Sequence, residues 1–377
     1  MRFPEFSGEW EKCSLNDIST IYGRIGFRGY TVADIVEKGE GAIALSPTNI
    51  DSNCLTYEKD NTYISTYKYE ESPEIKIFAG DIIFVKTGST VGKVAFVDNI
   101  IDRTTLNPQL VVLKQVKCNP YFLYLLMAAP CFQKHIKRIT VGGAVPTLSQ
   151  NEMGRIGITL PPNAEQDRIS ALFKLLNYRI ETQKKIIEKY ESLIRGLYQF
   201  LFQQAKYDHF VSLGDISQIS NGNSDVKDAS MYNDGSLYPF FDRSDEIKFL
   251  PEYLFDKEAI IYPGEGAEFY PRYYNGKFAL HQRCYAVYDI STDFIPRYLY
   301  HYCKTQNSYF VRNAVGSTVA SLRLDTFKRL KIPAIPTHHQ ESLVMFLDKI
   351  EAKIECNRTI LKKYEEQKKY LLFTLFI

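Results

Sequence analysis

The stretch VGGAVPTLSQNEMGRIGITLPPNAEQ, residues 141–166, returns as VGSTVASLRLDTFKRLKIPAIPTHHQ, residues 315–340. The offset of 174 then continues without a gap into the segments that follow each copy. A second echo stands near the start of each half, where SLNDISTI (14–21) returns as SLGDISQI (212–219) at an offset of 198. Repeats of this length define an architecture, so we conclude that the chain is one unit written twice.

The middle of each repeat differs between the two copies. The offset shrinks by 24 residues between the two echoes, so the ends of the repeat are alike while the middle differs in length and sequence. A shared frame with a divergent insert is how one scaffold can recognise two targets; an old duplication with ordinary loop drift is the alternative. The predicted parts are two globular domains and two helical segments, at 1–158, 159–205, 206–332 and 333–377.

A long helix is predicted after each Pro-containing link. Apolar residues recur every three or four positions from Ile169 to Leu201, and again from Leu343 through Phe346 to Leu375, which is the spacing of a helical seam. Each helix is about 57 Å long at the usual rise per residue. A narrow apolar seam needs a partner, and we expect the two helices to pair antiparallel, as a coiled coil about a pseudo-two-fold axis.

Two polar residues interrupt the seams at equivalent places. Gln183 and Asn357 are related by the offset of 174 and lie near the middle of their helices. Because a buried amide in a coiled-coil seam fixes register, we predict that Gln183 and Asn357 face each other. The alternative is that each faces solvent at a local bend.

The two globular halves have the sequence pattern of mixed, β-rich domains, which gives an α+β fold class. Short apolar runs broken by Gly and Asn predict strands, and longer apolar stretches follow them as predicted helices. Strands are predicted within 76–88, 93–99, 106–113, 258–266 and 277–289, and helices at 119–139 and 295–314.

Composition excludes several classes of protein. With 46 Lys+Arg against 44 Asp+Glu in 377 residues, the net charge is +2, so binding by phosphate neutralisation alone is excluded. Aromatic residues make up 14%, too many for a disordered chain. The seven Cys form no C-x-x-C pair, which argues for free thiols rather than a zinc or disulfide scaffold. With no signal-peptide pattern and no membrane-length apolar run, we expect a cytoplasmic protein.

No catalytic motif is found in the sequence. GSTVGKV (88–94) is not a phosphate-binding loop, because three residues rather than four separate its glycines and Val94 replaces the Ser/Thr that would hold magnesium. The tetrad Asn/Asp-Pro-Pro-aromatic of amino-group methylation is missing, and the His338–His339 pair has no neighbouring metal ligands in the sequence. We therefore expect neither a catalytic residue nor a metal site.

The duplicated, variable domain closed by a Pro…Gln link and a long helix resembles the DNA-specificity (S) subunit of type I restriction–modification systems. The resemblance spans the whole chain and is most specific in ITLPPNAEQDRI (158–169), IPAIPTHHQESL (332–343) and GDIIFVKTGSTVGK (80–93). The second link departs from the Pro-Pro-x-x-Glu-Gln form. The second half has GEGAEFYPRYYNGK (264–277) instead of GSTVGK, which puts a shared role of this loop in doubt.

The resemblance implies a function and a set of partners. Each target-recognition domain would read one half of a split sequence in double-stranded DNA, and the helix pair would set the spacer. Two modification (methyltransferase) subunits would dock on the helices, and restriction (motor nuclease) subunits would join them. S-adenosylmethionine, ATP and Mg would be bound by those partners, so this chain would bind no cofactor and would be a non-catalytic specificity subunit.

Polar and aromatic side chains in the inserts are the candidate DNA contacts, because Arg and Lys read guanine and Asn and Gln read adenine. Each could instead be an ordinary surface or turn residue, and the cluster at 270–274 could be a packed hairpin face. The candidates are Arg24, Arg28, Tyr30, Lys86, Thr87, Ser89, Thr90 and Lys93 in the first domain and Tyr270, Arg272, Tyr273, Tyr274, Asn275, Lys277 and Arg283 in the second.

Two other interpretations remain open. The chain could be a protein adaptor that uses only the helix pair, or the specificity part of a split methylase without restriction activity. The two globular domains together hold 32 basic and 33 acidic residues. Any basic DNA-facing surface must therefore be local, and we expect the isolated chain to bind DNA weakly.

Overall fold

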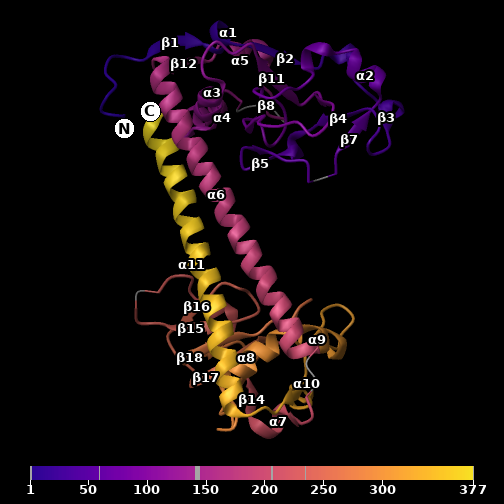
Figure 1. Cartoon of the computed structure of the whole chain (residues 1–377), viewed down its shortest axis with the longest axis vertical. Coiled ribbons are helices and arrows are strands. Elements are labelled where there is room, and N and C mark those ends of the chain that lie inside the picture. Colours follow the sequence, from indigo (N-terminus) through magenta and orange to yellow (C-terminus); the bar gives the residue numbers. More distant parts are fainter. Residues whose placement is uncertain (1, 59, 141–144, 205–206, 234, 377) are drawn as a thin grey trace. The chain divides into compact units, whose positions relative to one another are not determined.

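The computed structural model describes residues 2–58, 60–140, 145–204, 207–233 and 235–376. The chain forms two compact units, which we describe one at a time. Unit 1 comprises Met1–Thr182 with Leu361–Ile377, and unit 2 comprises Gln183–Ile360. Each unit therefore holds one globular domain and a part of both long helices (Figure 1).

Unit 1 is built on a six-stranded and a four-stranded sheet, besides a two-stranded pair described below, which matches the predicted β-rich character. Its five short helices are α1 (Leu15–Ile18), α2 (Thr66–Glu70), α3 (Pro120–Ala128), α4 (Pro130–Ile139) and α5 (Gln150–Gly154). The six-stranded sheet has the order β2 (Thr20–Gly23), β11 (Leu110–Lys114), β8 (Ile82–Val85), β9 (Val94–Phe96), β6 (Cys54–Leu55) and β5 (Ile50–Asp51). The four-stranded sheet has the order β10 (Thr104–Leu106), β4 (Ala42–Leu45), β7 (Thr62–Ile64) and β3 (Ile35–Val36).

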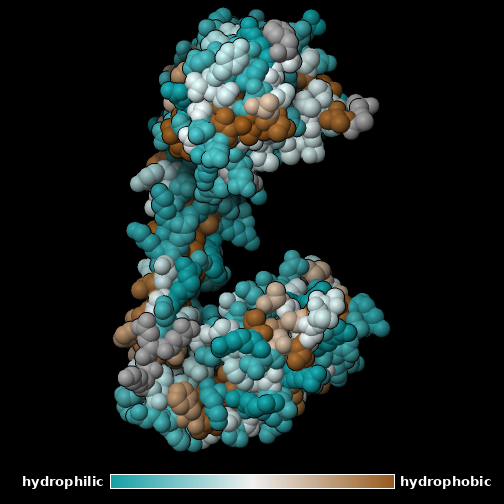
Figure 2. All heavy atoms as spheres, turned by 90° about the vertical axis from the view of Figure 1, so that its right-hand side faces the viewer, coloured by the Kyte–Doolittle hydropathy of each residue, from teal (hydrophilic) through white to brown (hydrophobic). Residues whose placement is uncertain are grey.

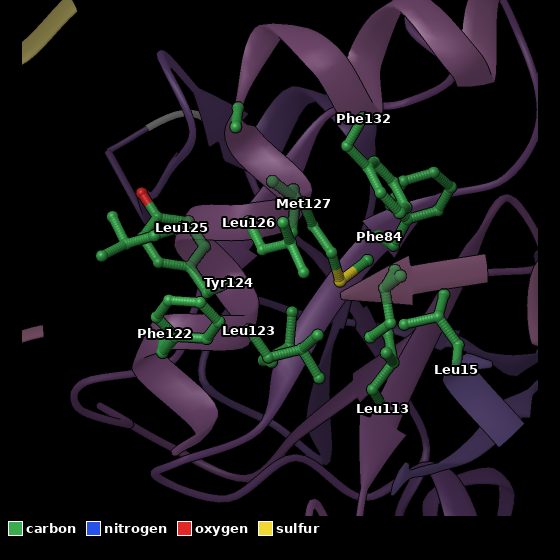
Figure 3. Packing of buried hydrophobic residues seen from close by; sticks show 14 of the residues in the cluster. Leu15, Phe84, Leu113, Phe122, Leu123, Tyr124, Leu125, Leu126, Met127 and Phe132 are labelled. Atoms are coloured by element: carbon green, nitrogen blue, oxygen red, sulfur yellow. The ribbon is translucent and has the colours of Figure 1, made fainter. Parts of the chain in front are cut away.

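Helix α3 is the centre of the unit 1 core. All of its residues from Tyr121 to Met127 are buried, and they pack with Leu15, Phe84 and Leu113 (Figure 3). The predicted single helix at 119–139 is two helices, because Pro130 lacks an N–H and keeps Ala129 extended. The break lets α4 leave the core and reach the surface.

Unit 2 has one six-stranded sheet and four short helices. The predicted strand at 277–289 is two strands, joined by a tight turn in which Cys284 N donates to His281 O (2.8 Å). The sheet order is β14 (Gln218–Asn221), β19 (Cys284–Tyr288), β17 (Phe255–Pro263), β18 (Arg272–Leu280), β15 (Tyr238–Phe241) and β16 (Lys248–Leu250). The helices are α7 (Leu213–Ile216), α8 (Pro296–Lys304), α9 (Asn307–Asn313) and α10 (Leu324–Lys328).

The two sequence echoes of each half lie beside each other in space. In unit 1, β1 (Glu11–Ser14) pairs antiparallel with β12 (Gly157–Leu160), the strand just before the long helix. In unit 2, β13 (Phe210–Ser212) pairs in the same way with β20 (Lys331–Pro333). The repeated segments are thus one two-part closure of the domain, and the predicted domain ends at 158 and 332 fall inside its strands.

The two long helices are α6 (Asn163–Tyr198), which continues into a π-helical turn at Gln199–Gln204, and α11 (Thr337–Leu375). In unit 1 the start of α6 meets the end of the chain, because Ile169 and Phe173 share a buried cluster with Leu375 and Phe376. In unit 2 the later part of α6 meets the earlier part of α11. Within each unit the helices therefore pack antiparallel, as predicted.

The predicted contact between the two polar seam residues is present in unit 2. Gln183 Nε2 donates to Asn357 Oδ1 (2.6 Å) and to Asn357 O (3.2 Å), and both side chains are buried. A few residues along, Arg358 pairs with Glu191 across the same two helices at 2.6 Å. Fixing of the register by the two amides stays a prediction.

The predicted seam is wrong at one position. Phe346 is exposed, and the neighbouring Leu347 is fully buried in its place. The seam of α11 begins at the buried Gln340 and runs through Leu343 to Leu347 and Ile350. A step of four residues after Leu343, rather than three, explains the difference.

The face shown in Figure 2 is dominated by hydrophilic residues, with apolar ones in small groups. Among the described residues, none of the helices is both long and apolar enough to cross a lipid bilayer.

We predict that Gln183→Leu alone lowers the free energy of unfolding by about 1–3 kcal/mol, because it leaves Asn357 Oδ1 buried without its donor. The double variant Gln183→Leu/Asn357→Leu should recover most of this loss, because two leucines can pack in the seam. Urea denaturation of the four combinations measures the coupling. Gln367→Leu, at an exposed position of α11, is the control. Simple addition of the two single losses would contradict the prediction.

Candidate nucleic-acid interface

The loop between β8 and β9 of unit 1 is a glycine-turned hairpin, as predicted in place of a phosphate-binding loop. Gly88 and Gly92 have φ values of +108° and +99°, a region that favours glycine. The loop is fixed on one side by Leu148 N, which donates to Lys86 O (2.8 Å), and by Gly88 N, which donates to Pro146 O (3.0 Å). This arrangement presents the candidates Lys86, Thr87, Ser89 and Thr90 together.

Helix α4 packs against the same loop and carries exposed basic side chains. Gln133 Nε2 donates to Gly92 O (2.7 Å), which ties the helix to the loop. Lys134, Lys137 and Arg138 are exposed on α4, and no carboxylate partner is found for them among the described residues. These three residues, which were not among the candidates, form a local group of exposed basic side chains, and contact with DNA stays a prediction.

Lys86 is the most suggestive member of this surface. Its side chain is half-buried, and burial lowers the pKa of its ammonium group. No carboxylate is paired with it in the part of the chain that the structure describes. A half-buried ammonium without a counter-charge favours an anion, and a DNA phosphate is an anion of suitable size.

Unit 2 has a loop in the equivalent position of the fold. Leu322 N donates to Gly264 O (2.8 Å), and Gly266 N donates to Ala320 O (3.0 Å), as Leu148 and Gly88 do in unit 1. The loop again rests on a short helix, because Phe269 N donates to Asn307 Oδ1 (2.8 Å) at the start of α9. The two loops share their frame and differ in their side chains.

The candidates Arg24 and Arg28 both bond to other groups of unit 1. Arg24 is only 5% exposed, and its guanidinium donates to Leu106 O (2.9 Å) and Thr105 Oγ1 (3.1 Å). Its charge lies over the ring of Tyr30 at 5.4 Å, and burial raises the pKa of that phenol. Arg28 pairs with a carboxylate, that of Glu74, at 3.4 Å. We leave these three out of the proposed contact set.

Lys93 lies at the base of the loop, where its ammonium donates to Ile50 O (3.1 Å). The bond holds the loop against β5 and leaves Lys93 half-buried. Lys93 thus holds the loop in place through this bond, and contact of Lys93 with DNA stays a prediction.

The candidate cluster at 270–274 in unit 2 is mostly a packed face of β18. Arg272 donates to Ser244 O (2.8 Å) and to Asp242 O, and burial lowers the pKa of its guanidinium. Tyr273 donates to Glu258, and Tyr274 packs on Phe241 and Phe278. The hairpin alternative therefore describes these three residues.

Four unit 2 candidates remain at the surface. Tyr270 and Asn275 are exposed, and neither side chain forms a hydrogen bond among the described residues. Lys277 lies over the ring of Tyr253 at 4.7 Å. Arg283 is exposed and forms a bidentate pair with Glu265 (2.7 and 2.9 Å).

Each domain separates its charges along the chain. Residues 1–102 carry 10 basic and 16 acidic residues, while 103–158 carry seven basic and one acidic. In the second domain the counts are eight and 15 for 206–293, and seven and one for 294–332. Net charges of −6 and +6, and of −7 and +6, follow from these counts. The acid-free stretch 103–151, with six Lys/Arg, is the signal that would have revealed α4.

The joint between the second domain and its long helices in unit 2 is a charge network in which His301 is fully buried and the other charged side chains are half-buried. Arg297 and His301 of α8 both reach Asp348 of α11, at 3.1 Å from Arg297 Nε and 2.7 Å from His301 Nε2. Lys304 reaches Glu351 at 2.5 Å. From α6, the Tyr198 hydroxyl lies 2.9 Å from His301 Nδ1.

His301, Asp348 and Glu351 are close enough together to hold a metal ion, so their charges decide the interpretation. Arg297 and Lys304 already neutralise the two carboxylates, and a divalent cation would be repelled by them. We therefore assign this group to the joint. A cavity of about 1100 Å³ lies beside it, lined by both cationic and anionic side chains.

Acid should loosen this joint. Burial lowers the pKa of His301. Burial alone would raise the pKa values of Asp348 and Glu351, but their bonds to Arg297, His301 and Lys304 outweigh it and lower them. All three groups bind protons more readily when unfolded, so their stabilisation is complete above the ordinary histidine pKa of 6.5 and declines as pH falls.

We predict that hydrogen-exchange protection of α8 falls between pH 7 and pH 5. The variant His301→Gln should have lower protection at pH 7, because it loses part of the network, but should lose little more at pH 5. Exchange measured by mass spectrometry, corrected for the intrinsic pH dependence, makes the comparison. Equal losses in the wild type and the variant would contradict the prediction.

Two copies of one mixed domain, each closed by a strand pair and followed by a long helix, define a duplicated two-domain specificity scaffold. The chain matches the family described as "Type I restriction modification DNA specificity domain" over residues 7–192 and 207–366. It therefore belongs to that family, which confirms the resemblance stated from the sequence.

Individual relatives agree with this assignment. The chain is 23% identical over 200 residues to the Haemophilus influenzae type I restriction enzyme HindI specificity subunit, covering 52% of this chain and 41% of that relative. It thus spans less than half of that relative's length.

Solved structures show the same fold. The S subunit of a type I restriction-modification system from M. genitalium has a TM-score of 0.66 at 14% identity, covering 100% of this chain and 99% of that one. A chain from a study of assembly and conformational transition of the type I R-M system has a TM-score of 0.57 at 15% identity, covering 98% and 97%. At these identities the likeness concerns the fold alone.

Proposed function

We propose that this chain is the sequence-specific DNA-binding subunit of a type I restriction–modification complex. Each recognition domain reads one half of a split site, and the helix pair sets the spacer between the halves. The observation that supports the proposal is the repeated loop-on-helix frame, in which α4 of unit 1, with its exposed Lys134, Lys137 and Arg138, is tied to the loop that holds Lys86. The chain itself has no proposed catalytic role.

The two loops support the reading of two different half-sites. In unit 1 the loop offers an ammonium group and hydroxyls, from Lys86, Thr87, Ser89 and Thr90. In unit 2 the equivalent loop offers carboxylates and an exposed tyrosine, Tyr270. Phosphate contacts position a protein, and base edges are read by side chains that differ between sites. A shared frame with different side chains meets both requirements.

The proposed partners are two modification subunits on the helix pair and restriction subunits that join them. S-adenosylmethionine, ATP and Mg are proposed to belong to those partners. Because the domains have almost no net charge, we propose that the partners also supply part of the phosphate contact. Action in the cytoplasm stays a prediction.

A protein adaptor built on the helix pair is the second candidate. It predicts that the complex has no preference for any DNA sequence. Methylome sequencing of the host distinguishes the two: loss of a split adenine motif on deletion of this gene supports the specificity subunit, and an unchanged methylome contradicts it.

We predict that changing Lys134, Lys137 and Arg138 to Ala weakens binding of the assembled complex to every DNA sequence alike. If all three contact phosphates, the negative slope of log K against log[salt] should become less steep by about 2.7, at about 0.9 per lost contact. The measurement is a salt titration of DNA affinity. A matched control changes Lys12, Lys38 and Lys227, exposed residues in the acidic parts of the domains. An altered motif, or equal slopes for both triple variants, would count against the proposed surface.

We also predict that replacing residues 206–332 with those of a relative changes only one half of the methylated motif. The first half should stay the same, because its recognition domain is untouched. Methylome sequencing of cells with the chimaera gives the result. A change in both halves would contradict the assignment of one half-site to each domain.

A further inference from the structure

Gln166, one of the residues that recur in both halves, is the centre of a buried latch in unit 1. Its side chain is 2% exposed. Its Oε1 accepts a hydrogen bond from the backbone N of Asn119 (2.9 Å), and its Nε2 donates to Pro161 O (2.8 Å). One amide thus joins three segments: the first turn of α6, the link before that helix and the start of α3.

Gln340 forms the same latch in unit 2. It is fully buried, its Oε1 accepts from the backbone N of Ile295 (2.8 Å), and its Nε2 donates to Ile335 O (2.9 Å). It donates in addition to Asp293 O (2.8 Å), beside the start of α8. The geometry is therefore repeated along with the residue.

Asn119 and Ile295 are the N-cap residues of α3 and α8, the helices on which the recognition domains are packed. Pro161 and Ile335 lie in the links that lead into α6 and α11. The amide therefore connects each domain to its own long helix at the point where the chain passes from one to the other. Methionine, of similar size, could fill the space but make neither bond.

The remaining contacts of the two joints differ. In unit 1, Asn177 donates to the Tyr121 hydroxyl (2.7 Å) and Lys174 lies 5.0 Å from the ring of that tyrosine. In unit 2 the equivalent region holds the ionic network of α8 with α11. The glutamine bonds are present in both joints although these other contacts differ, as is the strand pair that closes each domain.

We propose that Gln166 and Gln340 are positioning residues for DNA recognition. Each fixes the angle at which its recognition domain meets its own long helix, and so the spacing of half-sites that the complex accepts. This proposal rests on the proposed function. A rotation of about 10° moves a group about 15 Å from the pivot, roughly the radius of gyration of such a domain, by about 3 Å. That displacement is close to the rise of one base pair, about 3.4 Å.

The test uses the full chain in complex with a modification subunit from the same host. Methylome sequencing first defines the cognate motif. Duplexes then carry both half-sites with a spacer one base pair shorter, equal or one base pair longer, and the rate of adenine methylation is measured on each. The variants are Gln166→Met and Gln340→Met, which test the two joints independently. Lys174→Met, a change in the unit 1 joint outside the latch, is the control.

We expect each Gln→Met variant to raise methylation of an off-length spacer relative to the cognate one by at least tenfold, with both half-site sequences unchanged. Lys174→Met should keep the wild-type ratio. Each assay is run well below the melting temperature of its variant, so that loss of fold does not mimic the effect. Equal loss on all three spacers, or no change, would overturn the proposal. A wild-type complex that methylates no split motif would instead overturn the proposed function.

Discussion

Neither long helix can bury its apolar seam alone. Helices α6 and α11 are polar on most of their surface, and their few apolar side chains form a stripe that needs a matching stripe. Pairing the two helices satisfies both, and it makes each unit a composite of chain segments far apart in sequence. In unit 2 the contact of Gln183 with Asn357 is part of that match. The placement of every other element in a unit follows from where its domain meets this pair.

Repulsion between DNA phosphates and the carboxylates of the chain is a second constraint. The chain has almost as many acidic as basic residues and is therefore almost neutral. The domains meet this constraint by concentrating carboxylates in their divergent first parts and basic residues in their last parts. The exposed basic groups of α4 in unit 1 have no carboxylate partner among the described residues, whereas Arg24 and Arg272 donate to carbonyl groups inside the fold. Cationic side chains in the interior are thus placed by their hydrogen bonds, and a role in DNA binding is proposed for the exposed ones.

The helices, the repeat and the contact of Gln183 with Asn357 could be predicted from the sequence, because periodicity and offset are local properties of the chain. The sequence pattern places Phe346 in the seam, where the structure has Leu347. The seam of α11 begins at the buried Gln340, which is bonded to the start of α8, and this contact is not visible in the sequence. The internal use of Arg24 could not be predicted. Its partners Leu106 O and Thr105 Oγ1 lie about 80 residues away, and only the paired sheets bring them together. Lys134, Lys137 and Arg138 were visible in the sequence as part of an acid-free stretch, but only the packing of α4 on the hairpin loop gives them a place.

Leu375 and Phe376 are part of the core of unit 1, and this has a consequence for folding during protein synthesis. During translation the first recognition domain emerges long before these residues do, so its apolar cluster around Phe122 and Phe173 stays incomplete while the rest of the chain is made. Contacts of such large sequence separation form slowly. Of the two domains, the one translated first is thus completed last. Its nascent form is the species most exposed to chaperones and proteases.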